Sequence, residues 1–214
     1  VYIRGVKGFF TSKFDVRSLL NVGSSAFVEQ IFLRIGFLLF AITVANLGTT
    51  AYAAHQIGMN MMSLTFSLGD GLSVASVALI GRSLGEERRD LAKLYASMCQ
   101  RIGLFCAFVM SMVFLFFGRN LYGLFSNEQE ILDMGVMIMR MLCVIIYLQI
   151  TQVIFFGCLR GAGDTKYTAF ASMISVAIIR PGLSWLLCYP LGLGLLGVWL
   201  GLFGCLLYTS DAAD

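Results

Sequence analysis

Long apolar segments separated by short polar ones dominate the pattern along this chain. A membrane-spanning helix needs about 20 mostly apolar residues, whereas the strands of a membrane β-barrel alternate over about 10 residues. The apolar segments here are long and continuous. The pattern therefore predicts an all-α membrane protein. Its six spans, the last of them incomplete, are expected near residues 19–47, 50–80, 94–117, 132–159, 168–189 and from 191 onward.

Polar and charged residues mark the connections between these spans. A tight break at 46–49 separates the first two, and longer polar loops follow at 82–93, 118–130 and 160–166. Pairs of glycines four residues apart permit close approach of helices in a membrane. They occur at 81 and 85, 157 and 161, and 197 and 201, so close packing is expected at each pair.

Composition supports lipid as the surrounding medium. The 214 residues are 58% hydrophobic and 13% charged, against roughly 45–50% and 25% in soluble domains. A soluble protein of this size would need a polar surface, and this composition does not supply one. The net charge of +3 is too small and too scattered to indicate nucleic acid. The six cysteines form no CxxC pair, so we interpret them as small buried hydrophobes rather than as metal ligands.

Enzyme chemistry has no support in the motifs. The chain contains no HExxH, no glycine-rich phosphate loop and no nucleophile elbow. We therefore expect a protein that is not an enzyme and that has no cofactor.

Basic residues predict the orientation, because cytoplasmic loops of membrane proteins are enriched in lysine and arginine. On the side opposite the amino-terminal segment, Arg119 is the only basic residue in the predicted loops. We therefore expect a multi-pass protein of the plasma membrane with the amino-terminal end of the chain in the cytoplasm. The eleven basic residues on the amino-terminal side are Arg4, Lys7, Lys13, Arg17, Arg82, Arg88, Arg89, Lys93, Arg101, Arg160 and Lys166.

The two ends of the chain are expected to lie outside the transmembrane unit of residues 19–204. Residues 1–18 resemble a cytoplasmic linker rather than a signal peptide. Residues 205–214, CLLYTSDAAD, resemble the translation of a sequencing-library adapter, so we expect them to be an artefact.

Ionisable residues inside a membrane are costly and are therefore functional candidates. At 1.5 Å per residue, Glu29 and Asp70 both lie about 18 Å from the cytoplasmic ends of their spans, and Gln149 lies at about 16 Å. Carboxylates in a low dielectric favour the protonated form, so they can bind and release a proton or Na⁺ near neutral pH. Glu29 and Asp70 are therefore candidates for a coupling-cation site.

Alternatives remain for each acid. Glu29 could form an ion pair with Arg34, although five residues turn a helix by about 140° and direct the two side chains apart. Asp70 lies between Gly69 and Gly71, so a broken helix or a side-chain cap on the backbone is another interpretation.

Other polar residues within the spans could line a substrate path. Arg180 precedes Pro181, and a proline that interrupts a helix is typical of cavities in transporters. Helix packing is the alternative for Arg180. Snorkelling to the outer interface is favoured for Arg140, and packing or capping for His55. The candidates for the substrate path are Gln149, Tyr147, Asn60 and Arg180.

A set of short motifs gives a family resemblance. The sequence reads LGT at 47–49, AAHQI at 53–57, GLSVA at 71–75, LIGRSLG at 79–85 and LRGAGDT at 159–165. This combination, in this order from about 14 to 204, strongly resembles the multidrug and toxic compound extrusion (MATE) family, in the helices that form its carboxy-terminal lobe.

The resemblance implies half of a twelve-helix, two-lobed antiporter that exports amphipathic or cationic organic compounds in exchange for Na⁺ or H⁺. Its partners would be these small molecules, the lipid bilayer and an amino-terminal lobe of the same polypeptide. Glu29 matches the acid that many members carry in helix seven, so any bound Na⁺ is assigned there. One branch has an aspartate in helix ten where this sequence has Gln149. A lipid-linked precursor flippase of the related superfamily and a non-transporting helical scaffold are the alternatives.

Overall fold

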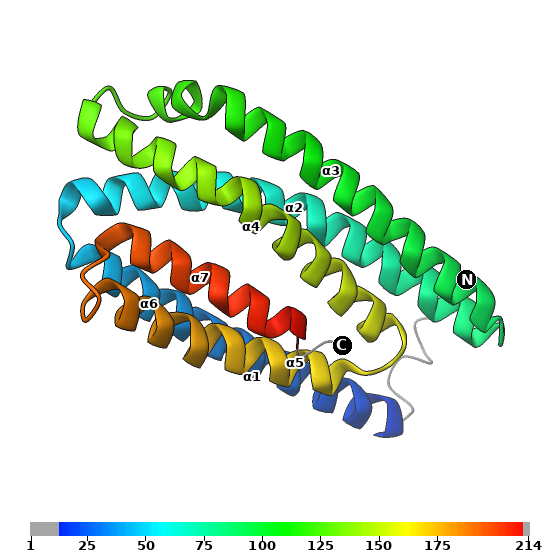
Figure 1. Cartoon of the computed structure of the whole chain (residues 1–214). Coiled ribbons are helices and arrows are strands. Elements are labelled where there is room, and N and C mark those ends of the chain that lie inside the picture. The colour runs from blue at the N-terminus through cyan, green and yellow to red at the C-terminus, as the bar shows by residue number, and fades with distance from the viewer. Residues whose placement is uncertain (1–12, 212–214) are drawn as a thin grey trace.

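Every regular element in the described part of the chain is a helix, as the sequence predicts. The computed structural model describes residues 13–211, and among them the side chains of 27–28, 30–165 and 167–208. Figure 1 shows the helices side by side as a lobe, which confirms the all-α membrane fold. They are α1 (Lys13–Ala45), α2 (Thr49–Gly85), α3 (Arg89–Gly123), α4 (Gln129–Gly161), α5 (Thr165–Ile174), the π-helical segment η2 (Ser175–Ile179), α6 (Arg180–Cys188) and α7 (Gly194–Asp211).

The ends of the lobe differ slightly from the expected boundaries. Helix α1 begins at Lys13, ahead of the predicted start of the first span, and α7 continues past 204 to Asp211. Residues 1–12 and 212–214 lie outside the described part. The linker and adapter assignments therefore stay predictions.

The fifth predicted span consists of three consecutive helical segments. Pro181 is near the start of α6, and η2 comes immediately before α6. A proline inside a helix removes one backbone hydrogen bond and crowds the carbonyl four residues earlier. The wider π turn relieves this crowding, so the span continues through Pro181 without a break.

The helices form two groups (Figure 1). Helices α2, α3 and α4 pack against one another, and α1 packs with α5, η2, α6 and α7. Helix α4 also contacts α7, and the short loop after α1 leads directly into α2. Buried Tyr122 joins the first group, since its hydroxyl donates to the Ala54 carbonyl at 2.9 Å.

Two of the three predicted glycine pairs lie at close helix contacts. A methyl group at Gly157 would overlap Ser73 of α2, and one at Gly161 would lie 3.0 Å from the Val77 backbone. Gly197 and Gly201 likewise face the backbone of α6. The third pair is split, because a Cβ of Gly81 would lie 3.5 Å from the Gly161 carbonyl of α4, whereas nothing lies within 4 Å of the position that a Cβ of Gly85 would take. The prediction of close packing is therefore wrong at Gly85, which lies at the end of α2.

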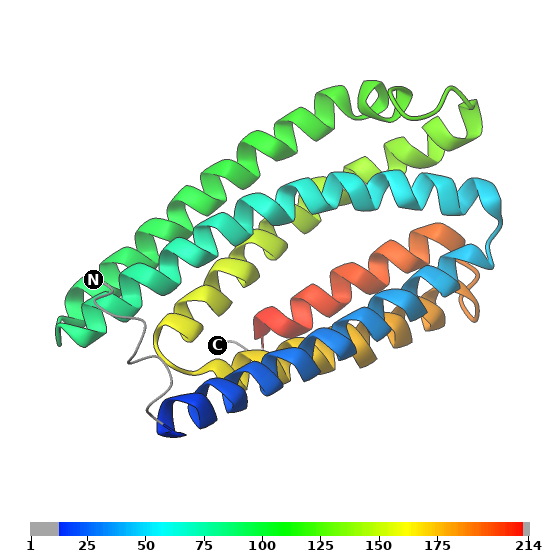
Figure 2. The same ribbon diagram turned by 180° about the vertical axis from the view of Figure 1, so that it is seen from behind.

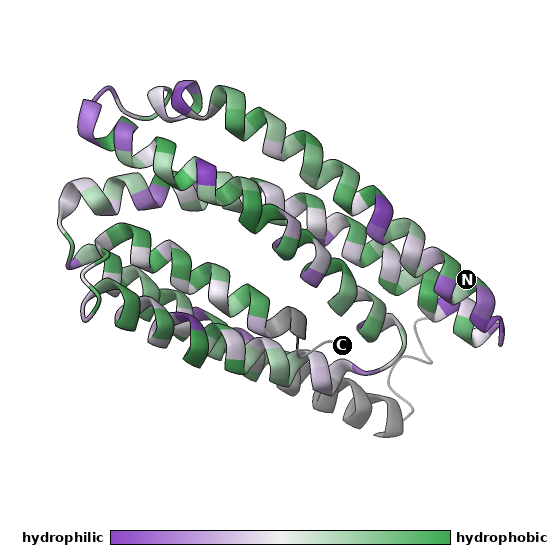
Figure 3. Ribbon diagram, in the orientation of Figure 1, coloured by the Kyte–Doolittle hydropathy of each residue, from purple (hydrophilic) through white to green (hydrophobic). Residues whose placement is uncertain are grey.

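Much of the outer surface of the lobe is apolar, as contact with lipid requires. Figure 3 shows hydrophobic residues around the middle of most helices and polar ones near their ends. Four helical stretches are long and apolar enough to cross a membrane, namely Thr49–Gly85, Arg89–Gly123, Gln129–Gly161 and Tyr167–Cys188. The loops at 86–88 and 162–164 lie at one end of the lobe, and those at 46–48, 124–128 and 189–193 at the other (Figure 1).

Candidate functional site

A stripe of polar side chains runs along the exposed face of α2. Its members are spaced by three or four residues, so at about 100° per residue they fall within about 80° of one another. All of them are exposed. At 1.5 Å per residue the stripe is about 21 Å long. We call these residues the α2 stripe: Gln56, Asn60, Ser63, Ser67 and Asp70.

The two serines of the α2 stripe already have hydrogen-bond acceptors in their own helix. The Ser63 hydroxyl donates to the Asn60 carbonyl at 2.7 Å, and the Ser67 hydroxyl to the Ser63 carbonyl at 3.0 Å. The side chains of Gln56, Asn60 and Asp70 form no hydrogen bond or ion pair with any described residue. Three strong polar groups are therefore available to a ligand, to water or to another part of the protein.

Lipid cannot cover this face of α2 at low cost. Two amides and a carboxylate in contact with hydrocarbon would each lose their hydrogen bonds to water, and polar residues within membrane helices face a bundle interior or a water-filled cavity. Figure 2 shows α1 and α2 on the same side of the lobe, joined at one end and diverging towards the other. This side is the best candidate for an aqueous path.

Asp70 lies on an uninterrupted helix. Helix α2 continues through both flanking glycines, and Gly69 packs on the Val153 side chain. No backbone group donates to the Asp70 carboxylate among the described residues. The broken-helix and capping interpretations of Asp70 are therefore wrong, because α2 stays helical through Gly69 and Gly71.

Gln149 lies in the interior of the lobe and not on the α2 stripe. It is 2% exposed, and neither its amide nitrogen nor its amide oxygen has a partner among the described residues. An unsatisfied buried amide costs about 1–3 kcal/mol, which a bound water or ligand would recover. Tyr147, two residues earlier on α4, is half-buried against the core.

Arg180 is buried at the start of α6, between two aromatic rings of α1. Its guanidinium carbon lies 4.7 Å from the centre of the Phe37 ring and 4.5 Å from that of Phe40. The side chain is 4% exposed, and its Nε and Nη2 atoms have no hydrogen-bond partner among the described residues. Desolvated cation–π contacts of this kind contribute about 2 kcal/mol or more.

His55 packs on Phe40, one of the two rings that contact Arg180. Its ring is edge-on to those of Phe40 and Trp199, with ring centres 5.2 Å and 5.6 Å apart. The imidazole is buried, and its Nδ1 has no partner among the described residues. This environment fits helix packing, one of the two roles that the sequence favoured for His55. Arg180 and His55 are thus close to each other and separate from the α2 stripe.

Glu29 lies in α1, and its side chain is outside the part that the structure describes. Further along α1, Gly36 packs on η2, where a Cβ would overlap the Val176 carbonyl. Arg34 is exposed, on another face of α1.

Sequence reasoning missed three members of the α2 stripe: Gln56, Ser63 and Ser67. Each is uncharged, so a search for ionisable residues at mid-membrane depth passes over it. The signal was available in the spacing, since polar residues at i, i+4, i+7, i+11 and i+14 share one helix face.

Comparison with known proteins agrees with this architecture. The MatE family model matches residues 25–186. The probable multidrug resistance protein NorM of Thermotoga maritima is 25% identical over 194 residues, which cover 91% of this chain and 42% of the relative. The uncharacterized transporter YisQ of Bacillus subtilis is 27% identical over 196 residues, with 91% and 43% covered. The chain thus spans less than half the length of these relatives.

Solved structures show the same fold. A MATE structure in the straight conformation superposes with a TM-score of 0.83 at 19% identity, covering 91% of this chain and 43% of that one. A transporter of the MOP superfamily from Pyrococcus furiosus superposes with a TM-score of 0.77 at 21% identity, covering 86% and 42%.

Proposed function

We propose, because this chain belongs to the MatE family, that it is one lobe of a multidrug-efflux antiporter. The transporter exports amphipathic or cationic organic compounds in exchange for Na⁺ or H⁺. The second lobe comes from the same polypeptide and faces the α1 and α2 side of this one, in the plasma membrane. The relatives named for multidrug resistance support the substrate class, and they are about twice the length of this chain.

The observation that carries the proposal is the exposed α2 stripe. A helix that is polar along one face and apolar elsewhere can cross a bilayer only if that face meets water or protein. A cleft between two lobes provides both. Gln56, Asn60 and Asp70 would contact a cationic substrate through amide and carboxylate oxygens, and Tyr52 adds an exposed aromatic ring one turn before Gln56.

Alternating access would then expose the α2 stripe to each side of the membrane in turn. Substrate enters from the cytoplasm or the inner leaflet. Binding of the coupling cation at Glu29 from the outside then favours release of the substrate. Gln149 stands where one branch of the family has a second acid. The proposed cation site therefore depends on Glu29, and Asp70 is the acid nearest the substrate. An internal repeat around a fixed central site is the usual basis of such transport.

Replacing Ser63 by leucine tests the α2 stripe. Leucine adds apolar volume in the middle of the path while α2 keeps its backbone hydrogen bonds. We expect export of a fluorescent organic cation from everted vesicles to fall about tenfold or more. A matched control exists in α3, where exposed Ser97 donates to the Leu94 carbonyl at 2.9 Å, the same local geometry. Equal export by S63L and S97L would contradict the path, and no gradient-driven export by the wild type would favour a scaffold.

A further inference from the structure

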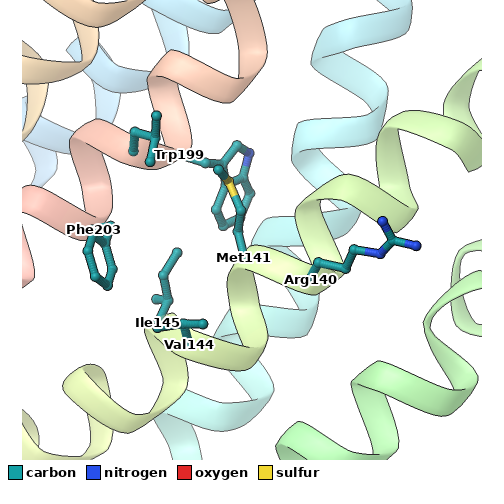
Figure 4. A pocket seen from close by; sticks show the side chains of 7 residues that line it. Arg140, Met141, Val144, Ile145, Trp199 and Phe203 are labelled. Carbon is teal, nitrogen blue, oxygen red and sulfur yellow. The ribbon is translucent and has the colours of Figure 1, made fainter.

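The side of the lobe formed by α4 and α7 has a groove of its own. Its volume is about 290 Å³, and Met141, Val144, Ile145, Trp199 and Phe203 line it. Figure 4 shows these apolar side chains converging from the two helices, while Arg140 extends away from them. Figure 1 faces α4 and α7, and Figure 2 faces α1 and α2, so the groove and the proposed aqueous path are on different sides.

Arg140 is the one charged residue among those that line the groove. It is exposed on α4, a helix that can cross the membrane, and it forms no ion pair or hydrogen bond with any described residue. An unpaired guanidinium at a lipid-facing position is unfavourable unless it reaches an anion or the membrane interface. An anionic lipid headgroup at the nearer interface meets both conditions.

The groove is charged at one end and apolar along the rest of its length, as a phospholipid is. On α4, Arg140 comes first, about 16 Å from the Gln129 end, and the apolar lining residues follow further from that end. Helical side chains lean towards the amino terminus of their helix, so the Arg140 side chain leans towards the nearer membrane surface. A charged group at the surface end with apolar walls below it matches a phosphate with an acyl chain.

We propose that the α4–α7 groove binds an anionic phospholipid. The phosphate contacts the Arg140 guanidinium, and the upper part of one acyl chain lies against Met141, Val144 and Phe203. Basic residues at pockets between membrane helices recognise anionic headgroups in this way. With the amino-terminal end of the chain in the cytoplasm, as the basic loops predict, the lipid belongs to the outer leaflet. The site does not depend on transport, so its failure would leave the antiporter proposal intact.

Native mass spectrometry of the purified protein that contains this lobe tests the proposal. Phosphatidylglycerol and phosphatidylcholine with identical acyl chains are added separately, and the bound fraction of each is compared. One basic residue at an anionic membrane surface contributes about 1 kcal/mol, so we expect a preference of about fivefold for phosphatidylglycerol. In R140Q this preference is expected to disappear. In R101Q, which removes an exposed arginine of α3 outside the groove, it is expected to remain.

A second variant addresses the apolar part of the site. Replacing half-exposed Val144 by tryptophan fills the groove, so V144W is expected to retain less of both lipids. The proposal is overturned if the wild type binds the two lipids equally, or if R140Q keeps the preference for phosphatidylglycerol. Unchanged retention of both lipids by V144W would overturn the position of the acyl chain.

Discussion

The polar residues inside the helices lie in two different environments. Asp70 and Asn60 are exposed on one face of α2, whereas Gln149 and Arg180 are buried. Counting residues from the membrane surface gives the depth of each residue, and depth alone puts Glu29, Asp70 and Gln149 together. Rotation about the helix axis and the identity of the neighbouring helix separate exposed Asp70 from buried Gln149. These two quantities depend on packing, which no single segment encodes.

Arg180 shows what sequence could and could not supply. The proline that follows it predicts an irregular helix, and the π-helical segment η2 is that irregularity. The rings that receive the guanidinium, Phe37 and Phe40, are about 140 residues earlier in the chain. Only the packing of α1 on α6 brings them together, so this partner set could not be predicted from the chain alone.

At the residue scale, neutralising Glu29 is the direct test of coupling. An amide cannot gain and lose a proton, and it binds Na⁺ more weakly than a carboxylate. In proteoliposomes that contain the complete transporter, we expect E29Q to lose most export of an organic cation driven by an imposed Na⁺ or pH gradient, by about tenfold or more. Comparing the two gradients in the wild type identifies the coupling ion.

The control for E29Q is E130Q, which removes an exposed carboxylate in the first turn of α4. Its export rate is expected to stay at the wild-type level. If E29Q also exports at the wild-type rate under the same gradient, coupling does not occur at Glu29. D70N would then become the next variant to measure, since Asp70 is the acid on the α2 stripe.

At the element scale, the contact between α2 and α4 depends on glycines. A methyl group at Gly157 overlaps Ser73, including its backbone, so the two helices would have to separate. Overpacking of this kind costs about 1–3 kcal/mol. We expect G157A to lower the thermal unfolding midpoint in detergent. G71A is the control, because nothing lies within 4 Å of its Cβ position and alanine is the better helix former. A midpoint in G157A equal to that of G71A would contradict this contact.

The helices and most of the glycine contacts were thus predictable from the sequence, whereas the polar face of α2 was only partly so. The apolar segments were long enough to define the spans, and glycine pairs at 157 and 161 and at 197 and 201 indicated where helices meet. Asn60 and Asp70 were found as single candidates. Their membership in one stripe follows from helical periodicity, and its exposure follows from which sides of α2 are occupied by α3 and α4.

At the scale of the whole molecule, alternate loops gather at opposite ends of the lobe (Figure 1). The end that contains the loops at 86–88 and 162–164 carries Arg88, Arg89 and Arg160, and the other end carries Arg119. Since positively charged loops remain in the cytoplasm, the first end is expected to be cytoplasmic. This assignment determines which end of the α2 stripe and of the α4–α7 groove lies nearer the cytoplasm.

Single cysteines introduced into exposed loop positions test the orientation. In intact cells, a membrane-impermeant maleimide is expected to label N127C in the loop before α4, and to label A162C only after the cells are permeabilised. The native cysteines among the described residues are buried or half-buried, so the unsubstituted protein gives the background. Labelling of A162C but not of N127C in intact cells would reverse the lobe in the membrane. It would also move the proposed lipid site to the inner leaflet, while the α2 stripe would stay on the same face of the lobe.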